Sequence, residues 1–204
     1  MYLLKKEFLT ISQKYTQDQS QIEDLWLEIK EAYLGRAYHN LSHLQTMYTL
    51  LLEVKDKIKN WDILMYAMFY HDFIYDVLRE DNEKRSGELS KISLNKLLLP
   101  LDKQIIVYEL IMATKGHSMQ SDEERAFFVD VDLAILALPS YQSYVKAIRI
   151  EYSIFSDEEY TQGRQKVIHT FLSQDRIYQS DYFFEKFEVL ARNNLKRELN
   201  IYGA

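Results

Sequence analysis

The sequence contains no cysteine, and among its 204 residues it has only five glycines and two prolines. Without cysteine, no disulfide framework can form and no thiolate can bind a metal, so any metal ligands must be His, Asp, Glu or backbone oxygen. The shortage of glycine and proline leaves little turn material for an all-β or α/β architecture. These absences favour a helical protein.

Long apolar runs and a basic surface are also missing. No apolar segment approaches the ~18 residues of a membrane span, and residues 1–6 lack the layout of a signal peptide. We therefore expect a cytoplasmic protein that does not enter a membrane. The 25 Lys and Arg are outnumbered by 31 Asp and Glu, for a net charge of -6. This balance argues against a nucleic-acid surface, which needs a basic face, but it leaves room for a small phosphorylated molecule bound by local cations.

What is present is typical of a folded domain. Apolar residues make up 47% of the chain and charged residues 27%, the balance of a soluble globular protein. Apolar residues recur with helical spacing, as at Leu4, Phe8, Ile11 and Tyr15. The chain has no repeat and no linker, so the prediction is one all-α domain, a helical bundle that spans residues 1–204.

Helix-capping signals support this prediction. Asn40 has the residue type of an N-cap before an apolar-periodic segment. Ser156, with Glu159 three residues later, forms a capping-box pattern. Gly116 follows a predicted helix that starts at Asp102, where glycine is a natural C-terminal cap. We expect the last helix to begin at Asp181.

The segment from Tyr66 to Asp76 is strongly apolar and aromatic, yet it carries His71 and Asp72 side by side. We expect a helix capped by Asp62, with this doublet in its middle and Asp76 one turn beyond Asp72. An unpaired carboxylate is costly to bury, so a doublet in apolar surroundings needs a partner. A divalent cation is one such partner, because neutral imidazole and carboxylate both bind transition metals.

Other ionisable residues recur in similar surroundings. His39 and His43 lie at the start of one expected helix, His117 lies at the end of another, and Asp130 and Asp132 lie inside a third, strongly apolar one. Helices can bring such side chains together in the core of a bundle, where metal sites are commonly built. A buried hydrogen-bonded pair without metal would also explain the His-Asp doublet, and the spacing alone leaves both interpretations open.

The order of these residues, a His, then a His-Asp doublet, then a distal Asp, resembles the HD-domain superfamily of metal-dependent phosphohydrolases. It is most similar to a bacterial family of predicted HD phosphohydrolases of uncharacterised substrate. The resemblance implies an all-helical HD-type domain. It rests on residues 38–44, 69–76, 81–86, 113–117 and 130–136, and it extends to residues 149–152, 163–164, 176–178 and 191–195.

Carried over residue by residue, the resemblance makes His71 and Asp72 metal ligands. The first ligand of the pattern is His43 or His39. We favour His43, because it lies inside the helix that would face the doublet. His39 would then contact the substrate or support the ligands from behind.

The distal ligand of the pattern is Asp132 or Asp130, with a slight preference for Asp132. The two are two positions apart, so on a helix they point in widely different directions and only one should face the metal. The ligand set suits a divalent metal ion, and Mn, Fe, Ni, Zn and Mg all remain candidates. Imidazole ligands make a transition metal more plausible than calcium.

The activity implied by the resemblance is attack of metal-activated water on a small phosphorylated substrate, of which a nucleotide is one example. Asp76 would orient or deprotonate the water, and Lys115 and His117 would contact the phosphate, as would Arg36. Two alternatives remain. One is a regulatory module that binds metal or nucleotide without turnover. The other, less favoured, is a di-iron oxygenase of HD type, which usually requires more histidines.

Overall fold

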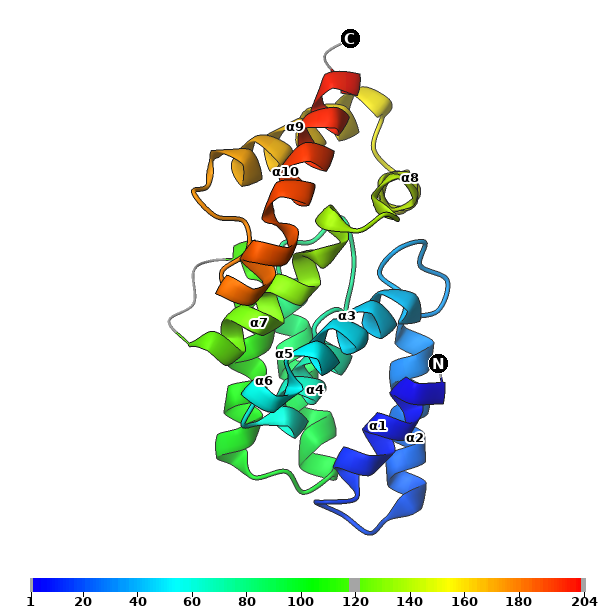
Figure 1. Cartoon of the computed structure of the whole chain (residues 1–204). Coiled ribbons are helices and arrows are strands. Elements are labelled where there is room, and N and C mark those ends of the chain that lie inside the picture. Colours follow the sequence, from blue (N-terminus) through cyan, green and yellow to red (C-terminus); the bar gives the residue numbers. More distant parts are fainter. Residues whose placement is uncertain (1, 118–121, 203–204) are drawn as a thin grey trace.

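The structure is a computed structural model in which residues 2–117 and 122–202 are described, without the side chain of His117. Within these ranges the chain forms ten α-helices, three short 3-10 helices and no strand (Figure 1). The prediction of an all-α fold is therefore confirmed. The α-helices are α1 (Tyr2–Ser12), α2 (Gln19–Ala32), α3 (Leu41–Glu53), α4 (Trp61–Tyr70), α5 (Asn82–Lys96), α6 (Leu101–Ala113), α7 (Glu123–Asp132), α8 (Tyr141–Glu151), α9 (Asp157–Ser173) and α10 (Asp181–Tyr202), and the 3-10 helices are η1 (Lys55–Lys57), η2 (Lys115–His117) and η3 (Leu133–Ala137).

Helix α4 lies at the centre of the bundle. Each of its residues from Ile63 to Tyr70 is buried, as expected for a helix that is apolar on all sides. Helices α1, α3, α5, α6 and α7 all pack against it. It has only 10 residues, and no helix in the described part of the chain is long and apolar enough to cross a membrane.

Aromatic contacts fix the C-terminal end of α4. The rings of Phe8 in α1 and Trp26 in α2 meet the ring of Phe69 edge to face, with centroids 5.3 Å and 6.1 Å away. The hydroxyl of Tyr33 donates to the Phe69 carbonyl at 3.1 Å. Such aromatic pairs stabilise the core beyond the area that they bury. Together they hold Phe69, which lies two positions before His71.

Several predicted helix starts are confirmed. Asn40 caps α3, and its side-chain oxygen accepts from the backbone N–H of Ser42 at 2.8 Å. Ser156 and Glu159 form a complete capping box at the start of α9, and Asp181 begins α10. Gly116 has a left-handed φ of 69°, as predicted for a residue that ends a helix, although α6 itself stops at Ala113.

The expected position of His71 and Asp72 in the middle of a helix is wrong, because α4 ends at Tyr70 and His71 is its C-cap. The guanidinium of Arg36 donates to the carbonyls of Asp72 and Phe73 at 2.5 Å and 2.9 Å, so these oxygens do not accept helical hydrogen bonds. Asp76 therefore does not lie one helical turn beyond Asp72. The expected cap at Asp62 is also wrong, because the N-cap residue is Asn60.

Helices α8, α9 and α10 form one end of the molecule, drawn in yellow-green to red in Figure 1, and α1 and α2 lie at the other end. η3 continues directly from α7 and packs on α10, which packs on α9. Arg164 of α9 and Glu198 of α10 form a buried bidentate ion pair, with N–O distances of 2.9 Å and 3.0 Å. This pair links the two helices that lie beyond the C-terminal end of α7, where the candidate site is found.

Candidate metal centre and its pocket

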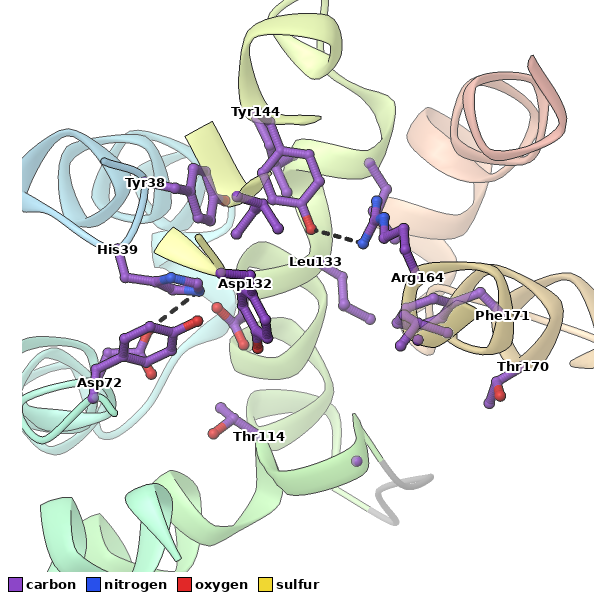
Figure 2. Close-up of a pocket in the computed structure, with 18 of the residues that line it drawn as sticks. Tyr38, His39, Asp72, Thr114, Asp132, Leu133, Tyr144, Arg164, Thr170 and Phe171 are labelled. Atoms are coloured by element: carbon purple, nitrogen blue, oxygen red, sulfur yellow. Dashed lines mark hydrogen bonds and ion pairs between the residues drawn. The ribbon is translucent and has the colours of Figure 1, made fainter. Parts of the chain in front are cut away.

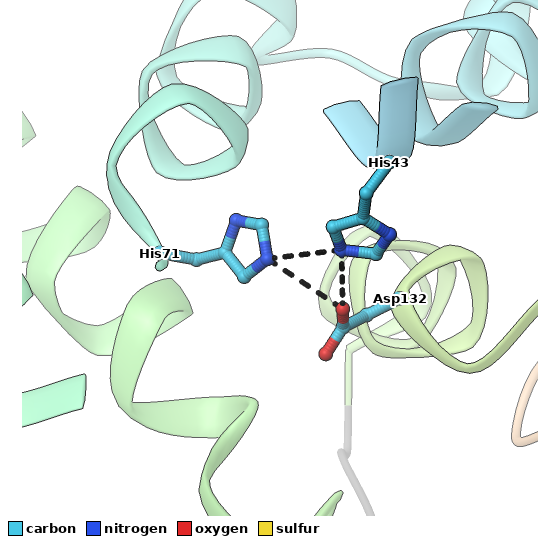
Figure 3. A group of neighbouring side chains, drawn as sticks. All are labelled: His43, His71 and Asp132. Atoms are coloured by element: carbon cyan, nitrogen blue, oxygen red, sulfur yellow. Dashed lines mark hydrogen bonds and ion pairs between the residues drawn. The ribbon is translucent and has the colours of Figure 1, made fainter. Parts of the chain in front are cut away.

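Three helices bring His43, His71 and Asp132 together (Figure 3). The Nε2 atoms of His43 and His71 are 3.3 Å apart. Asp132 Oδ1 lies 3.2 Å from His43 Nε2 and 3.6 Å from His71 Nε2. Both histidines are buried, with exposed fractions of 5% and 1%. Residues that are distant in sequence therefore converge on one point of the interior, as the sequence predicted for His43, His71 and an aspartate of the 130–136 segment.

Local hydrogen bonds fix both imidazole rings. His71 Nδ1 lies 2.9 Å from the backbone carbonyl of Met68. Because a carbonyl oxygen can only accept, Nδ1 carries a hydrogen and the neutral ring presents a lone pair at Nε2. His43 is the third residue of α3, and its Nδ1 lies 3.1 Å from the Tyr38 hydroxyl. Each ring thus turns its Nε2 toward Asp132, and outer contacts of this kind are the usual way in which metal-binding histidines are oriented.

The carboxylates beside the two imidazoles act on their pKa values in opposition to burial. Burial lowers the pKa of both imidazoles. At His71 the charges of Asp72 and Asp132 outweigh burial and raise its pKa well above the usual value. At His43 burial prevails and the pKa is lowered. In the metal-free protein the carboxylates therefore favour the protonated form of His71 rather than that of His43.

Asp72 faces the same group from the pocket. Its Oδ2 lies 3.1 Å from His71 Nε2 and 4.0 Å from His39 Nε2. Burial pushes the pKa of Asp72 up, but the imidazoles of His71 and His39 outweigh burial and hold that pKa well below its usual value. The carboxylate is therefore ionised and lies beside His71, outside the group of His43, His71 and Asp132 whose ligand atoms all lie within 4.8 Å of one another.

Asp130 points away from this group. Its carboxylate accepts from the backbone N–H groups of Gln179 and Ser180 at 2.7 Å and 2.8 Å and from the Ser180 hydroxyl at 2.6 Å. Burial raises the pKa of Asp130 to about 6, and these hydrogen bonds act in the opposite direction. The expectation that only one of the two aspartates faces the histidines agrees with the structure. Asp130 instead anchors the segment that leads into α10.

His39 lies at the edge of the group and is held by Glu151, the last residue of α8. His39 Nδ1 is 2.6 Å from Glu151 Oε2, and Glu151 Oε1 accepts from the backbone N–H groups of Tyr38 and His39. The ring of His39 packs on Tyr75, with centroids 4.1 Å apart. These contacts direct the other nitrogen, Nε2, toward Asp72 at the pocket wall.

Glu151 was missed by sequence reasoning, although one local signal marks it. An acidic residue in the last turn of a helix faces the negative end of the helix dipole, which is electrostatically unfavourable. A partner can offset this repulsion, and His39 is that partner. The signal marks Glu151 but does not identify His39, which lies 112 residues away.

Three further predicted residues, Asp76, Lys115 and Arg36, do not reach the group. Asp76 is exposed, and its carboxylate accepts a backbone hydrogen bond of its own loop at 3.0 Å. Lys115 is exposed and donates to a backbone carbonyl at 2.9 Å. Arg36 lies between α2 and α3, and it donates to the backbone carbonyls of His39, Asp72 and Phe73. The side chain of His117 lies outside the described part of the chain.

A pocket of about 630 Å³ opens beside the group. Figure 2 shows His39, Asp72 and Asp132 on one side and Arg164, Thr170 and Phe171 of α9 on the other. Leu133 lies between the two sides. The volume is in the usual range for sites that hold a small molecule, so the carboxylates and His39 at this wall are accessible to a ligand.

Comparisons with models of protein families, with curated proteins and with solved structures found no match for this chain.

The two aspartates of α7 should give opposite results when each is changed to asparagine. Asp132→Asn should abolish tight binding of a divalent ion, because it removes the charge that faces both imidazoles. Asp130→Asn should keep metal binding but lower the free energy of unfolding by about 1–3 kcal/mol, because the amide leaves buried donors poorly paired. Metal analysis and denaturant unfolding of the two variants measure these effects. Loss of metal from Asp130→Asn alone would reverse the assignment.

Metal binding at pH 7 should release about one proton, because the raised pKa of His71 leaves a proton on that ring in the metal-free protein. The same proton stabilises the metal-free fold below the ordinary histidine pKa, and this contribution is lost as pH rises through the raised value. Calorimetric titration with manganese in two buffers of different ionisation enthalpy gives the number released. A value of zero at pH 7 would contradict the assignment of the proton to His71.

Proposed function

We propose that the protein is a metal-dependent phosphohydrolase that acts on a small phosphorylated molecule. The observation that carries the proposal is the convergence of His43, His71 and Asp132, with Asp72 alongside, at the wall of a pocket. The same residues occupy the His, His-Asp, Asp positions in the resemblance to the HD-domain superfamily. The geometry and the order of the residues support the same site.

The donor set fits a divalent cation such as Mn, Fe, Ni, Zn or Mg. It offers the Nε2 atoms of two imidazoles, whose rings are oriented by the contacts of Nδ1 with the Met68 carbonyl and the Tyr38 hydroxyl, and carboxylates on the pocket side. A cation bound there supplies a Lewis acid that lowers the pKa of water and polarises a phosphoryl oxygen. The chain itself keeps the ligands buried and oriented, and it leaves the pocket side open for water and substrate.

The hydrolysis forms a bond between a water oxygen and phosphorus, and it breaks the bond between phosphorus and the oxygen of the organic group. That leaving oxygen must gain a proton, and the attacking water loses one to solvent. His39 is placed for the first transfer, since its Nε2 faces the pocket wall beside Asp72. Glu151 accepts from Nδ1 and fixes the ring. His39 delivers its Nε2 proton and recovers one from solvent.

Replacement of His71 should separate the site from the fold. His71→Ala should lose both bound metal and metal-dependent phosphate release from 4-nitrophenyl phosphate and a nucleotide panel, while the helical circular-dichroism signal remains. The matched control is His169→Ala on α9, an exposed histidine outside the pocket lining, which should keep both properties. Metal binding without phosphate release from any substrate would favour a binding module, and two irons per chain with oxygen uptake would favour an oxygenase.

His39→Gln and Glu151→Gln should keep bound metal and KM but lower kcat, by about 10²–10⁴-fold for an alkyl phosphate. The loss should be much smaller for 4-nitrophenyl phosphate, whose leaving oxygen needs little protonation. This dependence on the leaving group identifies a proton donor, because a structural defect would lower both rates equally. Equal losses with the two substrates would remove His39 from the reaction and Glu151 from its positioning role.

A further inference from the structure

We propose that the pocket beside the metal centre binds the organic part of a phosphoester that is bulky and largely apolar and carries little charge beyond one phosphoryl group. The inference rests on the proposed function and specifies its substrate class. Three features of the pocket carry it: an apolar helix face, a lining with more acids than bases, and a glycine that keeps the space open.

One face of α9 forms the long wall of the pocket. Tyr160, Gly163, Val167 and Phe171 all line it, and their spacing of three or four residues places them on one side of the helix. Glu159, Arg164 and Thr170 of the same helix border this apolar stripe in the lining. A helix rises about 1.5 Å per residue, so this face extends for roughly 16 Å. The wall is therefore longer than a phosphate group, and it can contact an extended ligand.

The facing walls are also predominantly apolar. η3 contributes Leu133, Ile135 and Leu136, and α8 with the segment after it contributes Tyr144, Ile148, Tyr152 and Phe155. The ionisable groups of the metal centre occupy only the end nearest α4, where His39, Asp72 and Asp132 are found (Figure 2). The pocket thus has a polar end suited to a phosphoryl group and an apolar extension suited to a hydrocarbon or an aromatic ring.

The charged groups of the lining disfavour a polyanion. Four carboxylates line the pocket, those of Asp72, Glu83, Asp132 and Glu159. In the described part of the chain, Arg164 is the only lysine or arginine of the lining, and its guanidinium is engaged by Glu198 at 2.9 Å and 3.0 Å. The phosphates of a nucleoside triphosphate would add negative charge beside these acids. A single phosphoryl group requires only the cation of the metal centre.

Gly163 leaves space at the pocket wall, at an exposed position in the middle of α9. Glycine weakens the interior of a helix relative to alanine. Its φ is not in the left-handed region, and a Cβ atom added there would meet no atom within 4 Å. Neither backbone conformation nor close packing therefore requires glycine. A larger side chain at this position would extend from the pocket wall.

The test compares four probes by calorimetry: methylphosphonate, octylphosphonate, 4-phenylbutylphosphonate and ATP. Each buried methylene should tighten binding about fourfold. A larger phosphonate that buries about three methylenes should therefore bind roughly 60-fold more tightly than methylphosphonate. We expect this gain for one or both of the larger phosphonates, and the tighter one shows whether the apolar part is aliphatic or aromatic. Equal affinity for all three phosphonates, or tighter binding of ATP than of both larger ones, would overturn the proposal.

Substitutions on α9 locate the apolar part. Gly163→Leu should lower the ratio of octylphosphonate to methylphosphonate affinity at least tenfold, whereas Gly163→Ala should change it little. Val167→Asp, at a position 44% exposed, should lower the same ratio. The matched control is Val189→Asp on α10, which is 71% exposed and outside the lining. If the ratio is unchanged in both Gly163→Leu and Val167→Asp, the ligand does not lie along α9 and the proposal fails.

Binding and turnover distinguish this inference from the proposed function. The titrations are made with and without manganese, so the gain in affinity from the apolar group is measured apart from metal binding. Phosphate release from octyl phosphate is measured in a separate assay. A strong preference for the larger phosphonates without any phosphate release would support the pocket and reject the hydrolase. Phosphate release without that preference would support the hydrolase and reject the pocket.

Discussion

The centre of this molecule is governed by one electrostatic constraint: the carboxylate of Asp132 lies within 3.6 Å of the Nε2 atoms of two buried imidazoles. A carboxylate in the interior needs hydrogen-bond or charge partners, because its desolvation is costly. A hydrogen on a facing imidazole nitrogen meets this requirement, and so would a divalent cation. The Met68 carbonyl and the Tyr38 hydroxyl hold the rings from outside the group, so the donors stay in place with either occupant.

The helical class and several helix starts could be predicted from the sequence because caps act within three or four residues. Asn40 and Ser156 are examples, since each bonds to backbone groups a few positions ahead. The end of α4 could not be predicted in this way. The turn beyond that end is held by Arg36, which lies 36 residues before Asp72 and donates to the carbonyl of that residue. No local signal around His71 reports such a contact.

Long-range contacts also decided the details of the site. The sequence restricted the distal ligand to Asp130 or Asp132, but the choice depends on residues 179 and 180, which take Asp130 away from the histidines. Glu151 lies 112 residues from His39, so the pair forms only when α8 folds over the pocket. Asp76 shows the converse. It is close to the doublet in sequence, yet the turn after α4 carries its side chain to the surface.

The break in α4 connects these features. Adjacent residues of a continuous helix diverge by about 100°, whereas the turn brings Asp72 Oδ2 within 3.1 Å of His71 Nε2. The same turn sets Tyr75 against the ring of His39. Arg36 donates to the backbone carbonyls of this turn, so its guanidinium serves the fold. In the proposed hydrolase, the bound cation would be the main positive charge offered to a substrate, and such an arrangement suits one phosphoryl group better than several.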